Sequence, residues 1–97
     1  MMNNKQYKMH MMDDSMEPRI YKGETLVVVD CDQVTEQGVY ISTMGDDIVC
    51  KDITPSPAGL LFKDNKGESH FYSDKDIKQQ PIHIIGRVIE TRRILSD

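Results

Sequence analysis

The sequence contains no tryptophan, two phenylalanines and only two cysteines, Cys31 and Cys50. Two cysteines this far apart exclude a disulfide framework and a zinc knuckle, so we expect reduced thiols and a cytoplasmic protein. Basic residues are also few, with 12 Lys and Arg against 16 Asp and Glu and a net charge of −4. Because phosphate binding needs a basic surface, the chain itself is not expected to bind nucleic acid.

Long hydrophobic runs are absent as well. None approaches the roughly 18 residues of a membrane span, and the polar start shows no secretory signal, so we expect no membrane contact. Three histidines and two cysteines have no metal-ligand spacing, and we expect neither a metal nor a cofactor. The methionines around His10 resemble a soft-metal site, but alternating methionines are more often core residues.

The apolar residues occur in short runs separated by turn-forming residues. The clearest run is Thr25 to Val29, and others lie at residues 7–12, 38–42, 48–53, 60–62, 70–72 and 82–95. This spacing predicts a mostly β fold of short strands, with residues 62–70 as a small hairpin and at most one helical turn at residues 16–21. We expect residues 1–97 to form a single domain, with a flexible start over residues 1–6.

Lys51 lies in an otherwise apolar strand. Because side chains alternate along a strand, Val49, Lys51 and Ile53 share one face, which is otherwise aliphatic. The amine there either extends to water or is desolvated. Desolvation favours the neutral amine, and a neutral lysine near pH 7 is a general base.

Ser15 is the candidate nucleophile for such a base. A serine before Glu17 and Pro18 is also typical of an ordinary N-cap. The same geometry leaves backbone N–H groups free beside the serine, as an oxyanion hole requires. A Cys50–His pair is an alternative nucleophile, but no neighbour that would lower the pKa of a thiol is identifiable.

These two residues occur within an ordered set of motifs, listed here in chain order: Asp14-Ser15-Met16-Glu17-Pro18, Lys22 to Asp30, Gly38 to Ile41, Ile48 to Ile53, and Ile85 to Ile89. The set resembles the self-cleaving C-terminal domain of LexA, lambda-type phage repressors and UmuD, the S24 serine peptidases. The resemblance extends from about Tyr7 to Ile94, and the spacing 51 − 15 = 36 suits the family's Ser–Lys pair.

The resemblance implies a LexA and signal-peptidase type of β fold, with Ser15 as nucleophile and Lys51 as general base. The backbone N–H groups of Asp14 and Ser15 would form the oxyanion hole. It also implies self-cleavage of an upstream linker in a transcriptional repressor, a homodimer, and promotion by the RecA filament or an antirepressor. Operator DNA would be bound only through an N-terminal domain outside this chain.

The sequence departs from the family pattern in two places. Asp13 stands where the family often has glycine, and with Asp14 it places two carboxylates beside Ser15, which would favour a charged lysine nearby and weaken the base. Only 14 residues precede Ser15, without the family's Ala-Gly or Cys-Gly cleavage site. We therefore interpret the chain as the catalytic and dimerisation part of a longer regulator or as a short stand-alone member. The alternatives are a non-catalytic dimerisation and partner-binding domain of the same fold and a UmuD-like polymerase subunit.

Overall fold

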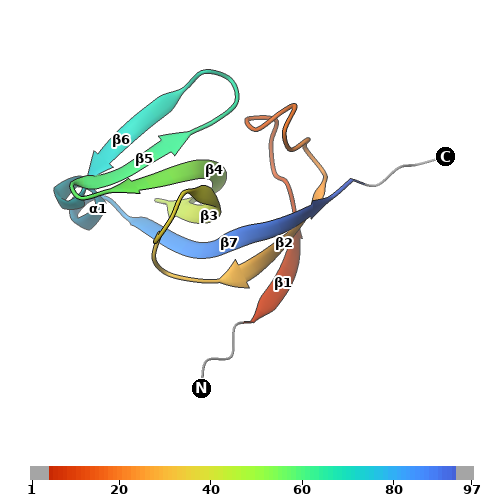
Figure 1. The fold of residues 1–97 in the computed structure, drawn as a ribbon, viewed down its shortest axis with the longest axis horizontal. Coiled ribbons are helices and arrows are strands. Elements are labelled where there is room, and N and C mark those ends of the chain that lie inside the picture. The colour runs from red at the N-terminus through yellow and green to blue at the C-terminus, as the bar shows by residue number, and fades with distance from the viewer. Residues whose placement is uncertain (1–4, 94–97) are drawn as a thin grey trace.

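The computed structural model describes residues 5–93, which form a mostly β fold as predicted (Figure 1). The elements are β1 (Gln6–His10), β2 (Thr25–Asp30), β3 (Gly38–Met44), β4 (Asp47–Ser56), β5 (Gly59–Lys63), β6 (Ser69–Ser73), α1 (Asp74–Gln79) and β7 (Ile82–Arg92). The expected flexible start at residues 1–6 falls mostly outside the described range. Gln6 already pairs with Val29, and the carbonyl of Lys5 accepts the N–H of Asp30 at 3.0 Å.

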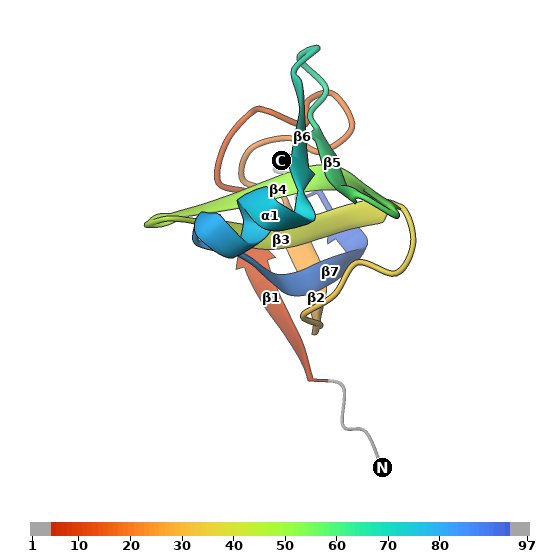
Figure 2. The ribbon, with the colours of Figure 1, turned by 90° about the vertical axis from the view of Figure 1, so that its left-hand side faces the viewer.

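All seven strands belong to one sheet in the order β1-β2-β7-β3-β4-β5-β6, and every neighbouring pair is antiparallel. The sheet is strongly curved, and Figure 2 shows the β5–β6 hairpin rising from it on the side opposite to β1. In Figure 1 the tip of this hairpin lies beside the loop between β1 and β2. Curvature therefore brings together two segments that are far apart in the order of the strands.

The core consists of two clusters on opposite faces of β3 and β4. Val39, Ile41 and Cys50 pack in the first cluster, whereas Tyr40 and Ile53 pack in the second. This division follows from strand alternation, because successive side chains point to opposite faces. The predicted parity of β4 is thus confirmed, and Lys51 lies on the face of the second cluster.

The last strand runs through the centre of the sheet between β2 and β3. Gly86 does not end it, although the sequence has an interruption there. A Cβ atom at Gly86 would lie 2.3 Å from Val28 and 2.8 Å from the hydroxyl of Tyr7, so only glycine allows this close approach. Ile94 and Leu95, which were expected to extend the strand, lie outside the described residues.

The helix α1 was not predicted from the sequence. It is only six residues long, but Ser73 caps it by accepting the N–H of Asp76, and the Asp76 side chain accepts the N–H of Ser73 in return. The spacing of Ser73 and Asp76 matches a capping box with aspartate in place of glutamate. This spacing is the sequence feature from which the helix could have been predicted. Within residues 5–93 no helix has the length and apolarity needed to cross a membrane.

Candidate active site

The loop between β1 and β2 carries Ser15 and is fixed at both ends. Met11 and the two residues before β2 exchange backbone hydrogen bonds, Met11 N–H to Glu24 O at 2.8 Å and Gly23 N–H to Met11 O at 2.9 Å. Within the loop, Met11, Met16 and Ile20 are buried in the first core cluster. These methionines are core residues, as interpreted from the sequence, and Met16 anchors the chain directly after Ser15.

The segment after Ser15 forms turns rather than a regular helix. Its one helical hydrogen bond runs from the N–H of Ile20 to the carbonyl of Met16 at 2.9 Å. Arg19 on this segment forms an ion pair with Asp52 of β4, with 2.7 Å between Nη1 and Oδ2. Core burial and this ion pair together attach the Ser15 loop to β4, the strand that carries Lys51.

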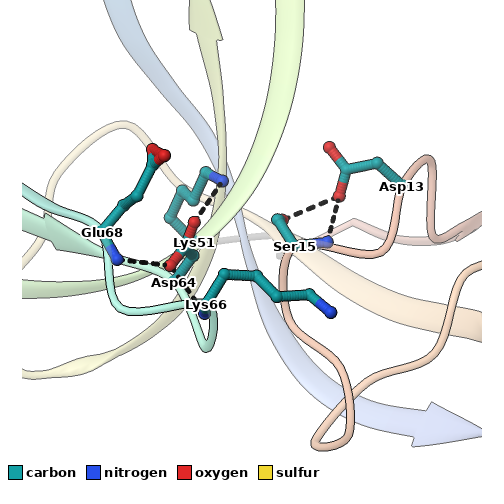
Figure 3. Close-up of polar contacts among 6 residues, drawn as sticks. All are labelled: Asp13, Ser15, Lys51, Asp64, Lys66 and Glu68. Atoms are coloured by element: carbon teal, nitrogen blue, oxygen red, sulfur yellow. Dashed lines mark hydrogen bonds and ion pairs between the residues drawn. The ribbon is translucent and has the colours of Figure 1, made fainter.

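Asp13 binds Ser15 in two ways. The Ser15 hydroxyl donates to Asp13 Oδ1 at 2.7 Å, and the Ser15 backbone N–H donates to the same oxygen at 3.1 Å (Figure 3). The second bond involves one of the two N–H groups predicted to form the oxyanion hole. The N–H that was expected to contribute to an oxyanion hole is thus bonded to a carboxylate, and the same carboxylate accepts the hydrogen bond of the Ser15 hydroxyl.

Lys51 extends from the middle of β4 opposite Tyr40 of β3. Its side chain is 21% exposed, and Nζ lies 3.8 Å from Asp64 Oδ2. On β4 itself the face that carries Lys51 is otherwise aliphatic, as expected, but the neighbouring strands β3 and β5 add aromatic residues to its surroundings. Tyr40 and Phe62 are aromatic, and the carboxylate arrives from a turn 13 residues further along the chain, a contact that strand alternation alone does not predict.

Asp64 is a site residue that the sequence analysis assigned only to a turn. Its side chain is 7% exposed. Oδ1 accepts the backbone N–H groups of Lys66 at 2.8 Å and Glu68 at 3.0 Å. Burial by itself would raise the pKa of Asp64, but these two hydrogen bonds and the neighbouring Lys51 ammonium hold that pKa below its usual value. Asp64 is therefore a stable carboxylate beside Lys51.

The turn between β5 and β6 contacts both candidate catalytic residues. Asp64 pairs with Lys51, and the N–H of the next residue, Asn65, donates to the carbonyl oxygen of Ser15 at 2.9 Å. Figure 3 shows Lys51 on the hairpin side and Ser15 on the loop side of this region. No direct hydrogen bond joins Ser15 and Lys51 within residues 5–93, since the Ser15 hydroxyl is bonded to Asp13. The fold brings the two residues to one turn without completing a Ser–Lys pair.

A pocket of about 440 Å³ lies between Lys51 and the β5–β6 hairpin. Its lining residues are Met44, Lys51, Phe62, Lys63, Asp64, Gly67, Glu68, Ser69, His70 and Tyr72. Ser15 is not part of this lining. The lining combines apolar and aromatic side chains with charged ones, and Lys51 and Asp64 are both part of it.

Cys50 is not a nucleophile in this structure. Its side chain is fully buried, and burial together with the nearby Asp13 carboxylate raises the pKa of the Cys50 thiol to about 12. Since only the thiolate is nucleophilic, the thiol is unreactive near neutral pH. Among residues 5–93, no three His, Cys, Asp or Glu side chains are grouped in a way that could hold a metal ion.

The fold and the position of Ser15 and Lys51 can be compared with known protein families. Residues 1–89 match the family model described as Peptidase S24-like. The chain belongs to the S24 peptidase family. No curated protein matches it at a significant level. Both Ser15 and Lys51 lie inside the part of the chain that this family model covers.

Proposed function

We propose that this S24 domain is the autopeptidase and dimerisation part of a bacterial or phage transcriptional repressor, with Ser15 and Lys51 as the catalytic pair. The observation that carries the proposal is the β5–β6 turn, which binds the Ser15 carbonyl through Asn65 and the Lys51 amine through Asp64. A lysine without a chemical role would be unfavourable on a strand face that is directed to the core, because a partly buried amine is costly to desolvate.

In the proposed reaction, neutral Lys51 removes the proton from the Ser15 hydroxyl while Oγ attacks a peptide carbonyl. The C–N bond breaks, the amine product leaves with a proton, and water then hydrolyses the acyl-enzyme. The backbone N–H groups of Asp14 and Ser15 stabilise the oxyanion. This requires Ser15 to exchange its hydrogen bond with Asp13 for one with Lys51, so the described arrangement is a resting state.

The substrate in this proposal is a linker upstream of the domain, and cleavage separates an N-terminal DNA-binding region from it. A homodimer allows the intact repressor to bind a two-fold operator. The RecA filament or an antirepressor would act by favouring the conformation in which Ser15 has left Asp13. Such a partner needs only to bind this conformation more tightly than the one in which Asp13 holds Ser15.

A second function is favoured by the Asp13 hydrogen bonds. If Asp13 holds Ser15 permanently, the domain is a non-catalytic module that dimerises and binds a partner. The contact between Asp13 and Ser15 thus separates the two proposals. Its removal should activate a latent peptidase, but it should have no effect on the reactivity of Ser15 in a non-catalytic module.

Covalent labelling by a serine-directed fluorophosphonate tests the pair directly. The intact protein is treated near pH 7 and near pH 10, with circular dichroism to verify folding, and adducts are located by mass spectrometry. We expect one adduct at Ser15, formed faster at the higher pH, absent in Ser15→Ala and slowed by about 10²- to 10⁴-fold in Lys51→Ala. If the folded wild type forms no adduct at either pH, the peptidase proposal is contradicted, unless labelling appears in the next variant.

Asp13→Ala is that variant. A hydrogen bond to a charged group contributes about 1.5–3 kcal/mol, so its loss should raise the labelling rate about tenfold or more. Asp46→Ala removes an equally charged, exposed side chain from the β3–β4 turn and serves as the matched control. Labelling that stays absent in Asp13→Ala would establish the non-catalytic module instead.

A further inference from the structure

The two oxygens of Asp64 have different partners. Oδ1 accepts two backbone N–H groups of its own turn, from Lys66 at 2.8 Å and Glu68 at 3.0 Å. Oδ2 is the oxygen nearest to Lys51, at 3.8 Å from Nζ. One oxygen therefore shapes the turn and the other faces the amine. An asparagine could retain the first function through its carbonyl oxygen while it removes the charge from the second.

The shape of this turn also determines its contact with the Ser15 loop. Asn65 lies between Asp64 and the two residues whose N–H groups Asp64 binds, and its own N–H donates to Ser15 O at 2.9 Å. A change in the turn would move this donor. Asp64 is thus connected to Lys51 through its charge and to Ser15 through the backbone of the adjacent residue.

We propose that Asp64 is a positioning residue for the catalytic pair, which orients the Lys51 amine with one oxygen and fixes the turn against the Ser15 loop with the other. This inference rests on the proposed function and assigns Asp64 a role in it. Asp64 does not touch the reacting atoms and does not exchange a proton. It acts on the reaction only through Lys51 and through the position of the Ser15 loop.

The charge of Asp64 has two opposite effects on the reaction. A carboxylate beside an amine favours its charged form, so replacing Asp64 by a neutral residue should favour the neutral Lys51 amine that accepts the proton. During the attack of Ser15, however, the proton moves from Oγ to Nζ and the new ammonium forms next to that carboxylate, which stabilises it. Replacing Asp64 by a neutral residue is therefore expected to change the labelling of Ser15 in opposite directions near neutral pH and at the high-pH plateau.

Asp64 is the single carboxylate within ion-pair distance of Lys51 among the described residues. The other titratable or charged side chains that line the same pocket are Lys63 on β5, Glu68 in the turn, and His70 and Tyr72 on β6. On β3 the residue opposite Lys51 is Tyr40. The neighbours on β4, Cys50 and Asp52, point to the other face. The expected change in the titration of Lys51 is consequently assigned to Asp64.

Two measurements on the intact chain test the inference. The first is the pH titration of Lys51 followed by NMR of ¹³Cε-labelled lysine, with Lys51→Arg to assign the signal. The second is the pH dependence of fluorophosphonate labelling, in which Oγ forms a bond to phosphorus, fluoride leaves and Lys51 takes the proton. Both are made on wild type, Asp64→Asn, Asp64→Ala and the matched control Asp46→Asn, an exposed aspartate in the β3–β4 turn.

In Asp64→Asn we expect both midpoints to fall by about 0.5–1 pH unit, the size expected for unit charges about 4 Å apart in a solvated site. Labelling near pH 7 should then rise severalfold, while the plateau at high pH falls slightly because a weaker base accepts the proton. Asp64→Ala also removes the acceptor of the turn, so its plateau should fall by more than tenfold. Asp46→Asn should leave both midpoints unchanged.

Unchanged midpoints in folded Asp64→Asn, with Ser15 still labelled, would overturn the inference and leave the proposed function intact. A lowered NMR midpoint in a protein whose Ser15 is never labelled would show a merely structural ion pair and would contradict both. An Asp64→Ala plateau equal to that of wild type would overturn the part of the inference that concerns the turn. If Asp64→Ala does not fold, Asp64→Asn alone decides the charge effect.

Discussion

At the scale of single residues, two carboxylates bind the candidate catalytic groups. Asp13 binds the hydroxyl and N–H of Ser15, and Asp64 pairs with the amine of Lys51. The Ser15 hydroxyl and the Lys51 amine are therefore each paired with a carboxylate and not with one another. Aspartates contribute in this way because a short, fully ionised side chain is a strong acceptor close to its own backbone.

Cys50 gives a prediction at the same scale. Its pKa is raised from an ordinary value of 9.0 to about 12, chiefly by burial and then by Asp13. Above pH 9 the unfolded chain loses the thiol proton while the folded chain retains it, so stability is complete below pH 9 and is lost as the pH rises towards 12. The free energy of unfolding of wild type should fall relative to Cys50→Ala by about 1.4 kcal/mol per pH unit in this window.

Urea unfolding of both proteins at several pH values measures this difference. The variant loses some packing at every pH, so the comparison concerns the slope and not the absolute stability. A difference in stability between wild type and Cys50→Ala that does not change with pH would contradict the assignment of Cys50 as a neutral buried thiol.

At the scale of elements, the Ser15 loop is closed by a buried glutamate. Glu24 is 6% exposed, and its carboxylate accepts the N–H of Tyr21 at 2.6 Å and an N–H of Arg93 at 3.3 Å. The Arg93 guanidinium also stacks over the Tyr21 ring at 4.5 Å. The end of β7, which the sequence analysis did not connect to the site, thus contributes to the base of the loop that positions Ser15.

Glu24→Ala should destabilise the protein by about 1–3 kcal/mol, because it removes a buried carboxylate that accepts the N–H of Tyr21 and an N–H of Arg93. Thermal unfolding measures this loss, and the labelling rate of Ser15 should fall with it as the loop loosens. Glu90→Ala is the matched control, since Glu90 pairs with Arg92 on the surface and exposed pairs contribute little. Equal melting temperatures for the two variants would contradict the role assigned to Glu24.

At the scale of the whole molecule, the sheet leaves large apolar side chains in solvent. Phe71 on β6 is 44% exposed and Ile89 on β7 is 51% exposed. The strand β6 is also an edge of the sheet, where backbone groups are free to pair. These exposed side chains on β6 and β7 are the candidate contacts for the homodimer that the resemblance implies.

The dimer remains a prediction, and sedimentation at high micromolar concentration measures it. We expect a dimer whose dissociation constant rises by about tenfold or more in Phe71→Ser or in Ile89→Ser, whichever side chain the interface buries. Ile48→Ser alters an equally exposed side chain, 49% exposed at the start of β4, and should have no effect. A protein that is monomeric throughout this range has no such interface.

The sequence by itself determined the local features. Short β-branched runs between turn residues predicted the strands, and alternation along residues 47–53 placed Lys51 and Cys50 on opposite faces. The resemblance from Tyr7 to Ile94 indicated the family and the two candidate catalytic residues. The helix α1 was missed because six residues give almost no periodicity.

Only the tertiary structure decided which groups meet. The partners of Ser15 and Lys51 are carboxylates, and the contact between the Ser15 loop and the β5–β6 turn depends on the curvature of a seven-stranded sheet. Asp64 was visible as a turn residue, but nothing in its neighbourhood along the chain shows that its second oxygen faces an amine on another strand. Sequence patterns report local conformation and the face on which a residue lies, whereas such pairings depend on how the whole sheet curves.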